Sequence, residues 1–328
     1  MSATPLRRRA RPKFSARSRD PTRLDFGHRL ESLEAPENTL EALEVAIANG
    51  CIGVEFDVAM TSDHVAVVMH DATLDRTTDG SGLVMHTTYA ELCKLDAACH
   101  TSPSGLSFHD LGFRGVRVPT VERVLRRALE ARLLISLDVK CPTTAERANL
   151  AGIPLVSDLG SAAYAPLLDR IDEFFQRMPD LYSYCAVCSF DPHLLARVKA
   201  RDPQIRLGLT HRKWRVSTTP AGVPRPIRMG ASPMTVAKLW VCDLAQDLSV
   251  RYLWWWWLDV DLLLLNRGGV NGTPLIGREE RRKWASRGVE LIVWTANSLA
   301  EKQRLAGEGC MFMTDATHPS KECTPQSC

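Results

Sequence analysis

Short apolar runs alternate along this chain with segments whose apolar residues recur every three or four positions. Runs of four to eight apolar residues are typical of buried strands, and the longer spacing is typical of amphipathic helices. Eight runs predict strands: LDF (24–26), IGVEFDV (52–58), LLISLDV (133–139), CAVCSF (185–190), IRLGLT (205–210), LWVCDLA (239–245), LIVWT (291–295) and CMFMT (310–314). Helical patterns fall between most of them, at 38–49, 120–132, 166–177, 192–200, 278–287 and 298–306.

This alternation predicts an α/β fold with parallel strands, and roughly 290 residues fit a closed (β/α)₈ TIM barrel. An open doubly wound sheet is the alternative, although no Gly-rich phosphate loop follows the first run. A long insertion at 61–119 predicts a small module after the second strand. We expect a tail at 1–23, the barrel domain at 24–316 and a second tail at 317–328.

Two acidic residues, Glu55 and Asp57, lie two positions apart in the second predicted strand. Residues i and i+2 of a strand face the same side, so the two carboxylates are neighbours. At about 5 Å and an effective dielectric near 20, their repulsion is roughly 3 kcal/mol. A hard divalent cation relieves it. The alternative is a solvent-exposed strand end that needs no ion.

Two histidines each follow an apolar run: His28 comes after LDF, and His70 closes VAVVMHD. Histidine titrates near neutral pH, so two of them can share the roles of general acid and general base. A single histidine at a strand end is often structural, whereas two that flank a carboxylate pair favour an acid–base site.

Four motifs resemble, in order and spacing, those of the glycerophosphodiester phosphodiesterase family: HRL (28–30), PENT (36–39), EFD (55–57) and HDATLDRTTDGSG (70–82). The similarity continues through ISLDVK (135–140), CSFDP (188–192), LTHRKW (209–214), KWASRGVELIVWTAN (283–297) and FMTD (312–315). LDVK, LTHRKW and VWTAN resemble most the membrane-bound branch that hydrolyses glycerophosphoinositol. The chain departs from the family at Leu30, where the family has Gly, and at Glu31, where it has a small residue.

The resemblance implies hydrolysis of a glycerophosphodiester to glycerol 3-phosphate and an alcohol. It implies a divalent metal, Mg²⁺ rather than Ca²⁺, on Glu55, Asp57 and Asp138, the last of which is Glu in much of the family. His28 and His70 are then the acid–base pair: one activates the glycerol hydroxyl and the other protonates the leaving alcohol. Water would open the resulting cyclic phosphate. The sequence does not say which histidine has which role.

The resemblance also implies three substrate-binding residues. Arg29 and Lys140 would hold phosphate oxygens, and Trp294 would stack on the glycerol backbone. The alternatives are a surface lysine after a strand and a core tryptophan at a strand end. In a TIM barrel, active-site residues lie at the carboxyl ends of the strands, where Lys140 and Trp294 are predicted to be.

The distribution of charged and apolar residues bears on the partners and the cellular location of the protein. Residues 1–23 carry a balance of +7, which leaves −4 for the other 305 residues, so nucleic acid is not an expected partner. The basic tail is either a disordered arm or a contact for an anionic membrane face. No apolar segment of the kind found in secretory signal peptides follows the first arginines.

The run at 252–265, YLWWWWLDVDLLLL, is too short and too charged to span a bilayer. Four consecutive tryptophans point all around a helix, and tryptophan favours the membrane interface. We therefore expect an interfacial helix or an exposed apolar loop from Tyr252 to Leu265, against the alternative of a packed barrel helix. The expected location is membrane-associated, and otherwise cytoplasmic.

Two other functions fit the same residues. One is a lysophospholipase D-type activity on membrane lipids, with the tryptophan-rich run delivering the substrate. The other is a non-catalytic membrane-associated scaffold, because Leu30 and Glu31 could crowd a bound phosphate.

Overall fold

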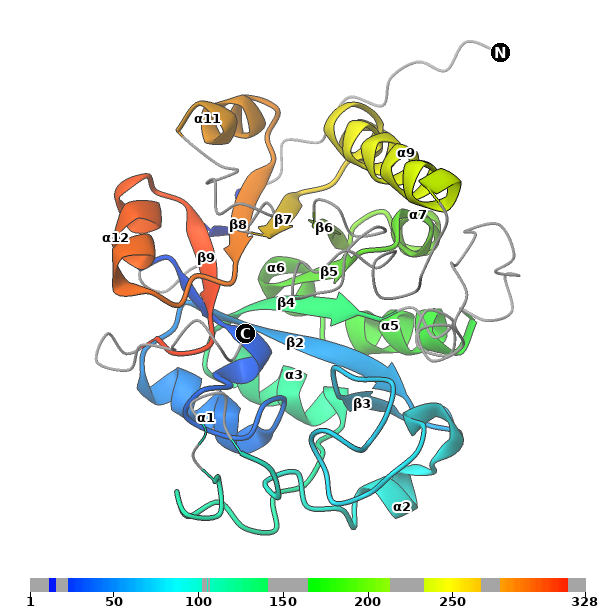
Figure 1. Cartoon of the computed structure of the whole chain (residues 1–328), viewed down its shortest axis with the longest axis vertical. Helices are drawn as coiled ribbons and strands as arrows, with labels where there is room; N and C mark the ends of the chain where they lie inside the picture. Colours follow the sequence, from blue (N-terminus) through cyan, green and yellow to red (C-terminus); the bar gives the residue numbers. More distant parts are fainter. Residues whose placement is uncertain are drawn as a thin grey trace.

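The computed structural model describes residues 12–15, 23–101, 105, 107–140, 165–212, 233–266 and 278–317 (Figure 1). Eight parallel strands form the barrel, and it closes because β1 pairs with both β2 and β9. They are β1 (Asp25–Gly27), β2 (Gly53–Met60), β4 (Leu134–Val139), β5 (Cys185–Ser189), β6 (Arg206–His211), β7 (Leu262–Asn266), β8 (Glu290–Trp294) and β9 (Met311–Thr314). The predicted TIM barrel is confirmed.

One predicted strand was wrong. The run at 239–245 lies inside helix α9 (Pro233–Ser249), and the sixth barrel strand is β7, which comes from the run of leucines that follows. A short run with six apolar residues out of seven carries too little periodicity to separate a strand from a helix. The last part of the interfacial segment expected at 252–265 is also wrong, because Leu262, Leu263 and Leu264 are buried in the barrel.

The six predicted helices form close to their expected limits: α1 (Leu40–Ala48), α3 (Val121–Glu130), α5 (Ala165–Arg177), α7 (Pro192–Arg201), α11 (Arg278–Ser286) and α12 (Leu299–Gly307). Side-chain caps fix several starts. Thr39 Oγ1 accepts a hydrogen bond from Ala42 N at α1, and Asp191 caps α7 in the same way. The apolar stripes of these helices pack on the outside of the barrel.

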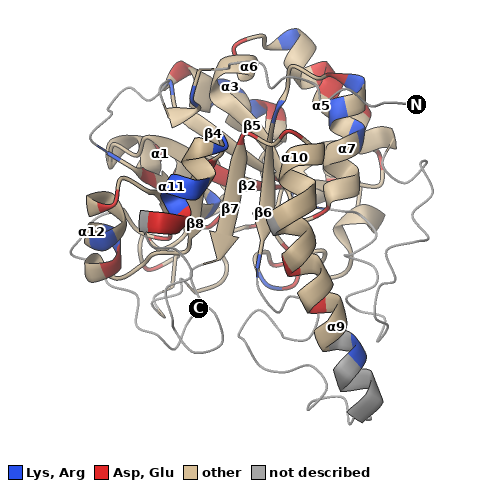
Figure 2. Ribbon diagram, turned by 90° about the horizontal axis from the view of Figure 1, so that it is seen from above, with Lys and Arg blue, Asp and Glu red and all other residues tan. Residues whose placement is uncertain are grey.

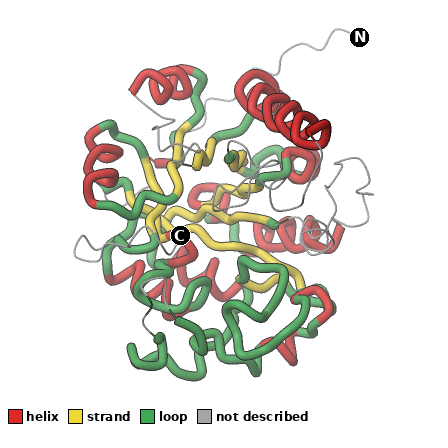
Figure 3. Tube along the Cα trace, viewed as in Figure 1, coloured by secondary structure: helices red, strands yellow, loops and turns green. Residues whose placement is uncertain are grey.

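The insertion forms a small module beside the barrel, made mostly of loops (Figure 3). Its strand β3 (Ala66–Val68) pairs antiparallel with the end of β2. Two short helical turns, η3 (Val84–His86) and α2 (Tyr89–Leu92), cover a separate hydrophobic cluster. Because β3 extends β2, the residues after it reach the carboxyl ends of the barrel strands.

The expectation of a solvated N-terminal arm does not hold for Pro12–Ser15. Phe14 is fully buried among the side chains that fill the barrel interior, and its ring stacks on that of Phe26 at 6.4 Å. Phe14 N donates to Glu290 Oε2 at 2.5 Å, and Pro12 O accepts from Arg206 at 3.0 Å. Arg206 and Glu290 begin β6 and β8, so this segment seals the amino end of the barrel. The rest of the arm lies outside the described residues, as do 318–328.

Candidate active site

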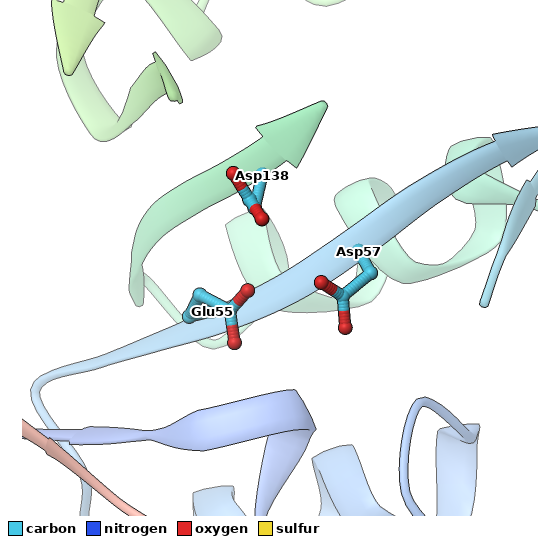
Figure 4. A group of neighbouring side chains, drawn as sticks. All are labelled: Glu55, Asp57 and Asp138. Atoms are coloured by element: carbon cyan, nitrogen blue, oxygen red, sulfur yellow. The ribbon is translucent and has the colours of Figure 1, made fainter. Parts of the chain in front are cut away.

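Three carboxylates converge at the carboxyl end of the barrel (Figure 4). The parallel register sets Asp57 of β2 beside Asp138 of β4, and Glu55 lies two residues earlier on the same face. All three are buried, and each offers a carboxylate oxygen within 4.8 Å of the others. The structure thus brings together the residues for which a metal site was predicted.

The charges of this cluster are unbalanced. Burial, reinforced by Asp57, raises the pKa of Glu55 to about 8. Burial also raises the pKa of Asp57, but Lys140, His70 and Arg29 outweigh that effect and hold it far below its usual value. Lys140 Nζ lies 2.8 Å from Asp57 Oδ1 and 2.6 Å from Asp138 Oδ2. Lys140 is therefore part of the cluster and is not a surface lysine.

A divalent cation fits these residues. Among the residues that the structure describes, Asp138 Oδ1 is buried without a hydrogen-bond partner, so one acceptor oxygen of the cluster is left unused. Leaving a buried polar atom unpaired costs free energy. The donor atoms are carboxylate oxygens only, which suits a hard ion such as Mg²⁺ or Ca²⁺. Burial and the neighbouring carboxylates raise the pKa of Glu55 because they disfavour a further negative charge in the cluster. A bound divalent cation would offset that charge.

His28 follows β1 and is held by a carboxylate from the far end of the chain. Its Nδ1 lies 2.6 Å from Asp315 Oδ1, and its Nε2 lies 3.9 Å from Glu55 Oε2. Asp315 is itself oriented by Ser32 Oγ and by Asn297 Nδ2, which donate at 2.8 and 2.6 Å. Burial alone lowers the pKa of His28, but the two neighbouring carboxylates outweigh it and raise the pKa above its usual value.

His70 follows β3 and forms a second dyad of the same kind. Its Nδ1 lies 2.6 Å from Asp71 Oδ1, which leaves Nε2 free of that bond. Burial lowers the pKa of His70, and the positive charges of Arg29 and Lys140 act in the same direction. The two histidines are therefore shifted to opposite sides of their ordinary pKa.

Arg76, from the inserted module, ties the second dyad to Arg29, which was predicted to bind phosphate. Its guanidinium donates to both oxygens of Glu37 at 2.7 and 2.8 Å, and to both oxygens of Asp71 at 2.6 and 3.1 Å. Glu37 in turn accepts from Arg29 Nη1 at 3.0 and 3.2 Å. The result is a continuous chain of paired charges from Arg29 to His70.

Asn38, Arg29 and Trp294 lie around the cluster. Asn38 donates to Asp57 Oδ2 at 2.9 Å, so the PENT segment orients a carboxylate of the cluster. Arg29 Nε is buried without a hydrogen-bond partner in the described part of the chain, and it lies 3.9 Å from Asp57 Oδ2. Trp294 ends β8, is partly buried and packs edge-on against Phe190 at 5.8 Å.

The departures at Leu30 and Glu31 turn away from the carboxylate cluster. Leu30 is fully buried in the hydrophobic core, and Glu31 accepts hydrogen bonds from the backbone and hydroxyl of Thr317. The backbone reaches this arrangement with positive φ at three successive residues, Arg29 (48°), Leu30 (69°) and Glu31 (103°). Such angles are costly for residues other than Gly, so the packing must enforce them.

Sequence reasoning gave no role to Asp315, Asn297 and Arg76. Each lies in a segment that carries the resemblance: FMTD, VWTAN and HDATLDRTTDGSG. The signal was present in the motifs, but the pairing with His28 and Glu37 depends on the closed barrel.

Comparisons with known proteins agree with this geometry. The model of the glycerophosphoryl diester phosphodiesterase family matches residues 28–315. Glycerophosphodiester phosphodiesterase 1 of Mus musculus is 32% identical over 303 residues, which cover 92% of this chain and 79% of the relative. The protein of the same name from Homo sapiens is 30% identical over 303 residues, which cover the same 92% of this chain and 79% of the relative.

Solved structures show the same fold. A phosphodiesterase from Oleispira antarctica, in complex with the product sn-glycerol-3-phosphate, superposes with a TM-score of 0.59 at 20% identity, over 89% of this chain and 92% of that one. Glycerophosphodiester phosphodiesterase from Thermotoga maritima superposes with a TM-score of 0.55 at 18% identity, over 90% of this chain and 95% of that one. The chain therefore belongs to the glycerophosphoryl diester phosphodiesterase family, and it is an enzyme that hydrolyses glycerophosphodiesters.

Proposed function

We propose that this enzyme releases glycerol 3-phosphate from glycerophosphoinositol by metal-dependent two-histidine catalysis. The observation that carries the mechanism is the buried cluster of Glu55, Asp57 and Asp138, with its unused oxygen, between two histidine–aspartate dyads. Mg²⁺ is the ion we favour at this cluster. When bound, it would offset the charge that develops on the non-bridging phosphate oxygens.

The opposite pKa shifts suggest a role for each histidine. His70, with its lowered pKa, is neutral near pH 7 and is the general base, whereas His28, with its raised pKa, is the general acid. Each ring is fixed through Nδ1 by an aspartate, so each presents Nε2 to the substrate. Arg29 and Lys140 hold phosphate oxygens, and Trp294 stacks on the glycerol.

The reaction then has two steps. His70 takes the proton of the glycerol 2-hydroxyl, whose oxygen attacks phosphorus, while His28 gives its proton to the departing alcohol. This leaves a cyclic glycerol phosphate, a protonated His70 and a neutral His28. In the second step His28 takes a proton from water, the hydroxide opens the ring, and His70 returns its proton to the glycerol oxygen.

The inositol head group and a membrane-associated location rest on the likeness of LDVK, LTHRKW and VWTAN to the membrane-bound branch. The test is the rate of glycerol 3-phosphate release from glycerophosphoinositol and from glycerophosphocholine by the same protein preparation. A higher kcat/KM for glycerophosphoinositol is expected. Equal or higher kcat/KM for glycerophosphocholine would overturn the head-group assignment and leave the chemistry in place.

A further inference from the structure

The helix that follows β6 is longer than the barrel requires. α9 continues without a break through a π-helical segment (η6, Val250–Trp254) into α10 (Trp255–Trp257). Twenty-five helical residues from 233 to 257 span roughly 37 Å, against about 17 Å for the five residues of β7. Figure 2 shows α9 projecting well past the end of the barrel toward which β7 points. Because parallel strands share one direction, this is the end that holds the active site.

The polarity of α9 is reversed from that of an ordinary surface helix. Asp243 on its inner side is buried, and Asp247 lies 3.2 Å from Nε2 of His211 at the end of β6. Its outer side carries a row of large apolar residues that are 46 to 66% exposed: Trp240, Leu244, Leu248, Tyr252 and Trp256. Surface helices normally turn their polar side to water. We call this row the α9 ridge.

The ridge keeps to one side of the helix because of the π-helical segment. Each step of four residues overshoots a full α-helical turn by about 40°, so a long row would wind away from its starting face. Turns of the π type hold more residues and offset part of this drift. Their position, between Leu248 and Trp256, returns Tyr252 and Trp256 to the exposed side.

The composition of the ridge matches a lipid surface. Among the side chains that the structure describes from 240 to 257, every exposed one is uncharged. Indole and phenol groups combine an apolar body with a polar atom, which suits the boundary between headgroups and acyl chains. The half-exposed Trp240, Tyr252 and Trp256 alone present roughly 300 Å². With the two leucines the row reaches the size of the largest apolar patch on a typical monomer, and such patches are often functional.

The shape of the ridge also distinguishes a membrane from a second copy of the chain. A stable protein interface buries about 800 Å² on each partner over a broad face. A single projecting helix offers a narrow convex strip instead, which suits insertion by about 5–10 Å into the headgroup region. Trp254 and Trp255 do not join it, since they pack on His193 and Trp284.

We infer that the α9 ridge docks lengthwise on a phospholipid membrane and holds the enzyme at the membrane surface. The contact thus runs along α9 to Trp256, in place of the segment from Tyr252 to Leu265 expected from the sequence. The ridge deepens the proposed function by naming the surface through which the enzyme would meet the membrane, and it rests on that function only for the membrane-associated location.

The test is co-sedimentation of the full chain with phosphatidylcholine vesicles. Trp240, Leu244 and Leu248 are replaced together by Ser, and a second variant carries Trp256→Ser. The control replaces Leu111 and Leu299 by Ser, because both are exposed leucines (46% and 36%) away from the ridge. We expect the triple variant to lose at least tenfold in vesicle partition and Trp256→Ser to lose less, with the control unchanged.

Hydrolysis of soluble glycerophosphoinositol and circular dichroism report that each variant is folded. The inference is overturned if the unmodified protein stays in the supernatant, or if the control loses as much partition as the triple variant. It is also overturned if sedimentation velocity without lipid shows a dimer that the triple variant converts to a monomer. Sedimentation does not depend on catalysis, so a protein that binds vesicles but hydrolyses nothing would contradict only the proposed function.

Discussion

Arg76 joins the two halves of the active site at the scale of single residues. Its N–H groups donate hydrogen bonds to both carboxylate oxygens of Glu37 and to both of Asp71, a geometry that only a guanidinium provides. We predict that Arg76→Lys lowers kcat about 10- to 100-fold, or roughly 1.4 to 2.7 kcal/mol in barrier. KM should change less, because the lysine is still able to neutralise one carboxylate.

The control for this change is Arg117→Lys. Arg117 lies in the same inserted module, and its bonds to described residues go to the backbone carbonyls of Lys94 and Leu95. Steady-state release of glycerol 3-phosphate measures both variants. An equal loss in the two would mean that Arg76 supports the module and not the site.

The proposed roles of the two histidines, His70 as general base and His28 as general acid, predict a bell-shaped dependence of kcat/KM on pH. His70 must be neutral and its pKa is lowered, so the acid limb should fall below the ordinary value of about 6.5. His28 must be protonated and its pKa is raised, so the basic limb should fall above that value. The residual activity of His70→Ala should lack the acid limb, and that of His28→Ala the basic one. Limbs lost in the opposite order would exchange the two roles.

Glu31 makes folding stability depend on pH. Burial raises its pKa to about 7, above the value of the unfolded chain, so the folded state holds a proton that the unfolded state loses. The stability that protonated Glu31 contributes is thus fully present below about pH 4.5 and is lost as pH rises to about 7, by about 3 kcal/mol in total. Urea unfolding of Glu31→Gln should lack this loss, and Glu41→Gln should keep it. The same pH dependence in Glu31→Gln would assign the effect to other groups.

The spacing of apolar residues determines the type of some secondary-structure elements and leaves the type of others ambiguous. α3 was predictable because Val121, Val124, Leu125 and Ala128 repeat at helical spacing and are all buried. The run at 239–245 was not, since an apolar helix that faces outward has the same composition as a buried strand. The outward position of Trp240 depends on the contact of α9 with β6, which no local pattern contains.

The N-terminal segment behaves as an element of the barrel. Its basic composition predicted a solvated arm, and the one aromatic residue within it overrides that reading. We predict that Phe14→Ala lowers the free energy of unfolding by about 3–5 kcal/mol, the usual cost of removing a buried phenyl ring. Lys13→Ala, at an exposed neighbour, is the control, and urea denaturation is the measurement. Equal stability of the two variants would show that the segment does not seal the barrel.

Over the whole molecule, alternation of strands and helices was enough to predict the barrel, and strand ends were enough to predict where the site lies. The residues that hold His28 and Glu37 could not be predicted from the sequence, because each pair of partners meets only when the barrel closes. His28 and Asp315 are 287 positions apart, and Arg76 and Glu37 are 39 apart. Leu30 was also uninterpretable from sequence, since its direction depends on positive φ angles that the surrounding packing imposes.

The central claim is that the buried carboxylates hold a metal that catalysis requires. The most direct measurement is release of glycerol 3-phosphate from glycerophosphoinositol after treatment with EDTA and after return of Mg²⁺ in excess. We predict a loss of more than about a hundredfold, roughly 2.7 kcal/mol in barrier, with full recovery in the unmodified protein and none in Asp138→Asn. Undiminished hydrolysis in EDTA would contradict the assignment of Glu55, Asp57 and Asp138 as metal ligands.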